Sequence, residues 1–88
     1  MTYRVTYTPK AKRALSEALP EAIATACVEF IGSALAENPQ RVGKPLRPPL
    51  AGLHAARRGE FRVIYRIDEG RVVVLVVTIE HRRTVCRP

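Results

Sequence analysis

The sequence is poor in the features that mark several large classes of protein. It has two cysteines in 88 residues, Cys27 and Cys86, and no C-x-x-C pair, so neither a disulfide framework nor a zinc site is supported. Its longest apolar run, Val72 to Val77, is far shorter than the ~20 residues that cross a bilayer. The first ten residues lack the apolar stretch of a signal peptide. We therefore expect a cytoplasmic protein with one domain over residues 1–88, since the chain is too short for two cores.

Specific catalytic motifs are also missing. The chain has no Gly-rich phosphate loop, no H-E-x-x-H and no paired-carboxylate site. Its two histidines, His54 and His81, are far apart in the sequence and have few acidic residues nearby. We therefore expect neither a metal site nor a cofactor.

What the sequence does have is positive charge in one half. Fifteen Lys and Arg residues against eight Asp and Glu residues give a net charge of +7. Residues 1–40 contain four of each sign, whereas residues 41–88 contain eleven basic and four acidic residues. Twelve of the fifteen cations are Arg, whose planar fork suits phosphate. This bias favours binding to RNA or DNA over a membrane, with a general solubilising charge as the alternative.

The first half of the chain predicts one strand and two helices. Apolar and polar residues alternate over residues 2–7, which is typical of a strand. Thr8 and Pro9 predict a helix start, and that helix is expected to end at Leu19. A second helix is expected over residues 21–37, with an apolar stripe that includes Cys27 as a core residue.

The second half predicts strands. Residues 38–52 hold four prolines and two glycines and are expected to form a loop. Strands are expected over residues 53–58, 61–67 and 72–79, the last of them central because it is apolar on both faces. The residues after 79 are expected to form an edge strand or an extended arm.

These elements together predict an α+β fold. An N-terminal strand and a two-helix hairpin precede a three- to four-stranded antiparallel meander, and the helices cover one face of the sheet. The other face would carry Arg62 and Arg66.

A cluster of cations with one imidazole is the strongest candidate for chemistry, and it suits RNA cleavage because RNA carries its own nucleophile, the 2′-hydroxyl. Arg can stabilise the charge that grows on the phosphate, and His81 is the nearby group that titrates near neutrality. A solvent-facing His in a basic tail is the alternative interpretation of His81. The cluster consists of Arg57, Arg58, Arg62, His81, Arg82 and Arg83.

The order of short motifs in residues 43–87 resembles the RelE branch of the RelE/ParE toxin superfamily. The motifs are K-P-L-R at Lys44 to Arg47, an Arg-x-Gly-x-Phe-Arg-Val-x-Tyr strand ending at Tyr65, an acidic-Gly turn, a Val-rich strand and a terminal His-Arg-Arg. Two positions differ from the family pattern. The strand over residues 53–58 has no lysine, and Cys86 stands where relatives commonly have Tyr.

The resemblance implies a toxin of a bacterial toxin–antitoxin pair that cuts messenger RNA on the ribosome without a metal ion. It implies as partners an acidic antitoxin, the ribosome and messenger RNA, with DNA contacted only through the antitoxin and no membrane. By position, Arg62 would stabilise the scissile phosphate, and Arg82 would contact phosphate near the leaving oxygen. The residues expected to bind RNA or the ribosome are Lys44, Arg47, Arg57, Arg58 and Arg83.

Two other functions fit the same resemblance. One is a ParE-like inhibitor of DNA gyrase that does not cleave RNA. The other is an inactive relative that remains bound to its antitoxin on DNA.

Overall fold

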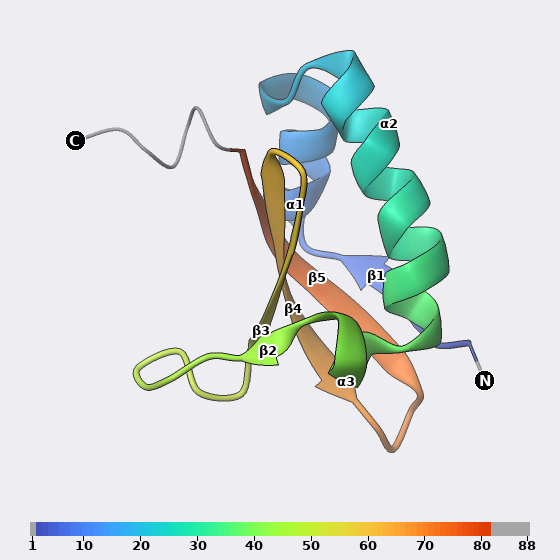
Figure 1. Cartoon of the computed structure of the whole chain (residues 1–88), viewed down its shortest axis with the longest axis vertical. Helices are drawn as coiled ribbons and strands as arrows, with labels where there is room; N and C mark the ends of the chain where they lie inside the picture. Colours follow the sequence, from blue (N-terminus) through green and yellow to red (C-terminus); the bar gives the residue numbers. More distant parts are fainter. Residues whose placement is uncertain (1, 82–88) are drawn as a thin grey trace.

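The structure, a computed structural model, describes residues 2–81 and packs three helical segments against a five-stranded sheet (Figure 1). In chain order the elements are β1 Arg4–Tyr7, α1 Pro9–Arg13, η1 Ala14–Ala18, α2 Glu21–Phe30, η2 Ile31–Leu35, α3 Pro39–Val42, β2 Lys44–Pro45, β3 His54–Arg58, β4 Phe61–Asp68 and β5 Val73–His81. The segments η1 and η2 are π-helical turns that continue α1 and α2. The predicted α+β class is confirmed.

The predicted helix starts and apolar stripe are confirmed. Thr8 caps α1, because its Oγ1 accepts a hydrogen bond from the backbone N–H of Ala11 at 3.1 Å, and Pro9 takes the first helical position. The stripe of α2 and η2 is buried against the sheet at Cys27, Phe30, Ile31 and Leu35. Burial raises the pKa of the Cys27 thiol to about 11.

The strand order is β1-β5-β4-β3-β2, with β1 parallel to β5 and every other pair antiparallel. The antiparallel meander has four strands, β2 to β5, within the predicted three to four. Its fourth strand is β2, and the other edge of β5 pairs with β1, where the Arg4 amide donates to the Val72 carbonyl at 2.9 Å. Residues 80 and 81 belong to β5, and residues 82–88 lie outside the described part.

The prediction of a loop over residues 38–52 was wrong in its first half, which forms α3 and β2. Pro39 begins α3 and is buried, and its carbonyl accepts a 2.5 Å hydrogen bond from the Tyr65 hydroxyl. Gly43 then lets β2 approach β3, because a Cβ there would lie 2.7 Å from the Ala55 carbonyl oxygen of β3 and 2.3 Å from Tyr65 Oη. Residues 46–53 remain irregular and project from the body of the molecule (Figure 1).

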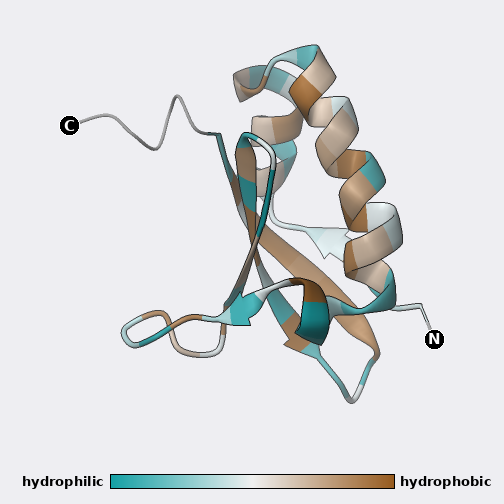
Figure 2. Ribbon diagram, viewed as in Figure 1, coloured by the Kyte–Doolittle hydropathy of each residue, from teal (hydrophilic) through white to brown (hydrophobic). Residues whose placement is uncertain are grey.

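The helices cover one face of the sheet and leave the other open (Figure 1). The core lies between the helices and the covered face, where Val63, Tyr65, Val74 and Val76 are fully buried. The ribbon of β5 is correspondingly hydrophobic in Figure 2, whereas that of α2 alternates between hydrophobic and hydrophilic residues. Among residues 2–81, no helix is long and apolar enough to cross a membrane.

A bulge in β5 changes which of its side chains face the core. Tyr65 pairs with Val76, but Ile64 pairs with Thr78, so Val77 has no partner on β4. The alternation of faces therefore shifts by one residue at Val77. Before the bulge Val74 and Val76 are buried, and after it Ile79 and His81 are buried.

Candidate nucleic-acid interface

The open face of the sheet carries most of the cations that β-strands contribute. Residues paired across neighbouring strands share a face, so the pairings place Arg57, Arg62 and Glu80 in one row across β3, β4 and β5. The next row contains Lys44 of β2, and a further row contains Arg66 of β4. The expectation that Arg62 and Arg66 share the uncovered face is confirmed.

Arg62 is held in place by Glu80. Its Nε donates to Glu80 Oε1 at 2.8 Å, and its terminal Nη2 contacts the same oxygen. The side chains of Arg62 and Glu80 are 39% and 32% exposed. This geometry fixes the plane of the guanidinium at the surface while leaving part of it accessible to an anion. Glu80 was not among the residues predicted for the site.

His81 lies on the opposite face from Arg62. It is 4% exposed, pairs across the sheet with Phe61 of the core, and has Nε2 3.3 Å from Glu60 Oε1. The structure therefore contradicts the alternative of a solvent-facing histidine. It also does not bring His81 together with Arg62, because the bulge at Val77 turns His81 toward the covered face.

The remaining predicted cations are dispersed. Arg57 is exposed on the open face, whereas its neighbour Arg58 lies on the covered face, with its Cζ 5.1 Å from the centroid of the Phe30 ring. Lys44 is exposed in β2, and Arg47 is exposed in the irregular segment that follows. Arg82, Arg83 and Cys86 lie outside the described residues.

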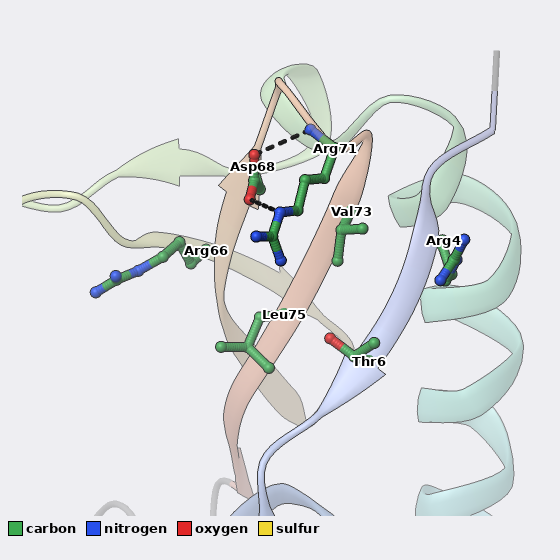
Figure 3. Close-up of a pocket in the computed structure, with 7 residues that line it drawn as sticks. All are labelled: Arg4, Thr6, Arg66, Asp68, Arg71, Val73 and Leu75. Carbon is green, nitrogen blue, oxygen red and sulfur yellow. Dashed lines mark hydrogen bonds and ion pairs between the residues drawn. The ribbon is translucent and has the colours of Figure 1, made fainter.

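A second group of arginines was missed as a site. Arg66, Arg71 and Arg4 line a hollow at the other end of the open face, together with Thr6, Asp68, Val73 and Leu75 (Figure 3). The four-residue spacing places Arg66 on the same face as Arg62, because strand side chains two or four apart share a face, but it gives no sign of a hollow at that end. Arg4 could not be added from the sequence, since its neighbour β5 is remote in the chain.

Comparison with known proteins assigns the family. Residues 5–85 match the family described as ParE toxin of type II toxin–antitoxin system, parDE. The chain belongs to this toxin family. Within it, the chain is a RelE-like toxin: it is 50% identical over 91 residues to Toxin RelE of Mycobacterium tuberculosis, covering 98% of this chain and 93% of the relative. It is 45% identical over 87 residues to Toxin RelG of the same organism, covering 99% of each chain.

Solved structures agree with this assignment of the RelE-like toxin. A chain in the toxin–antitoxin complex RelBE2 of M. tuberculosis matches with a TM-score of 0.90 and 45% identity, covering 93% of this chain and 100% of that one. A chain in the archaeal RelE–RelB complex of Pyrococcus horikoshii matches with a TM-score of 0.70 and 28% identity, covering 93% and 97%. The recognition of the RelE branch from residues 43–87 is thereby confirmed.

Proposed function

We propose that this RelE-like toxin is an endoribonuclease that cuts messenger RNA on the translating ribosome, without a metal ion as the family resemblance implies. The 2′-oxygen of the RNA attacks the adjacent phosphorus, and the bond from phosphorus to the 5′-oxygen breaks. The 2′-hydroxyl proton leaves to solvent, and the departing 5′-oxygen gains a proton. One product ends in a 2′,3′-cyclic phosphate and the other in a 5′-hydroxyl.

The observation that supports this proposal is Arg62 on the open face with its guanidinium plane fixed by Glu80. A planar fork beside the scissile phosphate stabilises the charge that develops on the non-bridging oxygens. Glu80 acts as a positioning residue for Arg62. Arg57, next to Arg62 in the row, adds a second positive charge for the RNA backbone.

His81 does not fit a catalytic role beside Arg62, because it is buried on the other face and lies near Glu60. The remaining catalytic proposal from the sequence is Arg82, which would contact phosphate near the leaving oxygen. No imidazole that could act as a general base lies beside Arg62 among residues 2–81. The toxin should therefore depend on the ribosome to align the attacking hydroxyl.

We also propose an acidic antitoxin as the inhibitory partner, with DNA contacted only through it. Two of the matching structures are complexes of a RelE-type toxin with its RelB-type antitoxin. The net charge of +7 would accelerate association with an acidic partner, and that acceleration falls as salt screens the charges.

Primer extension on reporter messenger RNA after induction of the toxin tests the proposal. We expect cuts within the translated codons of a reporter, and we expect them to vanish when its start codon is removed. Equal cutting of translated and untranslated RNA, or no cutting during growth arrest, would contradict ribosome-dependent cleavage.

Inhibition of DNA gyrase is the second candidate, because the matching family is described by its ParE toxin. A supercoiling assay with purified gyrase distinguishes the two functions. Loss of supercoiling at toxin concentrations that leave reporter RNA intact would favour gyrase inhibition.

A further inference from the structure

The hollow at the far end of the open face, called here the Arg66 hollow, is lined by residues from β1, β4, β5 and the turn between β4 and β5. Val73 and Leu75 of β5 are half-buried in the strand between the lining residues of β1 and β4 (Figure 3). Arg66 extends outward from β4, and Arg71 reaches from the turn to the side of Asp68 (Figure 3). The hollow has a volume of about 620 Å³, within the ~300–1,000 Å³ that is common for sites of small ligands.

The Arg66 hollow has an excess of positive charge. Three arginines line it against one carboxylate, Asp68. Asp68 is already engaged, since its Oδ1 accepts from the backbone N–H of Arg71 at 3.1 Å and its Oδ2 is 4.0 Å from Arg71 Nε. The Arg71 side chain is still 84% exposed. Within residues 2–81, Arg4 and Arg66 take part in no ion pair. An anionic ligand would therefore find guanidinium groups that no carboxylate neutralises.

The mixture of guanidinium groups and an apolar floor points to a nucleotide rather than a bare anion. Val73 and Leu75 offer a surface for the face of a base, while an Arg guanidinium can stack on that base or pair with a phosphate. Loss of either kind of contact would weaken binding. A simple phosphate ion would gain nothing from the apolar floor.

The position of the hollow relates it to Arg62. Arg62 and Arg66 lie four residues apart on one face of β4, a separation of about 13 Å along the strand. We propose that the Arg66 hollow holds a nucleotide of the substrate RNA strand at a distance from the phosphate that Arg62 contacts. This inference rests on the proposed function and makes the open face an extended RNA track instead of a single phosphate site.

Binding of single-stranded RNA oligonucleotides of two and nine nucleotides, measured by fluorescence anisotropy with the full chain, tests the proposal. The dinucleotide has one internucleotide phosphate and is too short to reach both Arg62 and the hollow, whereas the nine-nucleotide strand reaches both. We expect Arg66→Ala and Leu75→Ser each to weaken binding of the long RNA about 5- to 20-fold with little effect on the short one. Arg66→Ala should also lower the salt slope of long-RNA binding by about 0.7, the value for one lost phosphate contact.

Arg13→Ala, in α1, is the matched control, since it also removes one exposed positive charge, but at a position away from the open face. Thermal unfolding of each variant shows whether the fold is retained. If Arg66→Ala and Leu75→Ser weaken long-RNA binding no more than Arg13→Ala does, the hollow binds no nucleotide. If they weaken binding of an acidic peptide and leave RNA binding unchanged, the ligand is a protein and the proposal is wrong.

Two further results distinguish substrate RNA from ribosomal RNA in the hollow, and the hollow from the proposed function. Weaker binding to vacant ribosomes, with unchanged binding to the long oligonucleotide, would assign the hollow to ribosomal RNA and overturn the substrate assignment. The proposed function itself is tested by the effect of Arg62→Ala on cleavage. Loss of cleavage in Arg62→Ala together with unchanged RNA binding in Arg66→Ala would leave the endoribonuclease standing and refute the hollow.

Discussion

The two faces of strands β4 and β5 differ in nearly every physical respect. The covered face presents Val63, Tyr65, Val74 and Val76 to the helices, and all four side chains are fully buried. The open face presents Arg62 and Arg66 of β4, with Arg57 of β3 beside Arg62. One pair of strands therefore stabilises the fold with one set of side chains and offers charge with the alternate set.

This separation means that stability and activity should respond to different substitutions. Truncation on the covered side removes apolar contacts and leaves a cavity, which lowers the free energy of unfolding. Truncation on the open face removes a charge that no core residue depends on. Single substitutions on each face measure how complete this separation is.

The largest effect on stability is expected for Leu35→Ala in η2, because Leu35 is fully buried in the core. Such a truncation costs about 2–5 kcal/mol in the free energy of unfolding. Urea denaturation followed by circular dichroism measures it. Leu50→Ala, at a side chain that is 51% exposed, is the control and should change stability by less than about 0.5 kcal/mol. Equal effects of the two variants would contradict the assignment of the core.

The largest effect on activity is expected for Arg62→Ala. It should lower cleavage about 10²- to 10³-fold, the typical loss for one group that stabilises transition-state charge, while the thermal midpoint stays within a few degrees. Arg62→Lys should restore only part of the activity, because an ammonium keeps the charge and loses the fork. Primer extension on induced cells measures both. Full toxicity of Arg62→Ala would remove Arg62 from the proposed site.

The bulge at Val77 explains why the fold was easier to predict than the site. Alternation, the Thr8 and Pro9 helix start and the apolar run of β5 predicted the elements, because each depends on neighbouring residues. Pairing across β4 and β5 depends on register. An uninterrupted ladder from Asp68 and Val73 would place His81 on the face of Arg62 and Glu80 on the other face.

The inserted residue exchanges these two side chains, so the imidazole enters the covered side and the carboxylate meets Arg62. No propensity of Val77 distinguishes it from the valines before it, since all occur in one apolar run. The short segments α3 and β2 were not predicted from the sequence for a related reason. They are specified by the contacts of Pro39 and Gly43 with Tyr65, which is more than twenty positions away in the chain.

A smaller effect on the open face is expected for Glu80→Gln. The amide oxygen can still accept a hydrogen bond from Arg62, but the negative charge beside the proposed phosphate site is gone. RNA affinity should rise by up to about fivefold, since a partly exposed ion pair contributes ~0–1 kcal/mol. Anisotropy with a short RNA measures the change. Glu29→Gln on α2 changes the net charge equally at an exposed position of the helix layer, so it should have little effect. If both variants raise affinity alike, the effect belongs to net charge and not to the contact with Arg62.

The smallest effect concerns the covered side at alkaline pH. Burial raises the pKa of Cys27 from its ordinary value of 9.0 to about 11 and that of Tyr65 from 10.0 to about 12. For each group, at a pH between its ordinary pKa and its raised pKa, the unfolded chain has lost a proton that the folded chain keeps. The free energy of unfolding therefore falls as the pH rises. This contribution is fully present below about pH 9 and is lost as the pH passes through the folded pKa values. Thermal midpoints should therefore fall above pH 9, and less steeply in Cys27→Ala once its own loss of packing is subtracted.

In a Cys86→Ser background, which leaves Cys27 as the one thiol, a thiol reagent at pH 8 should label the folded protein slowly and the urea-unfolded protein at once. Rapid labelling of the folded protein would show that Cys27 is accessible to solvent, which would contradict its burial between the helices and the sheet.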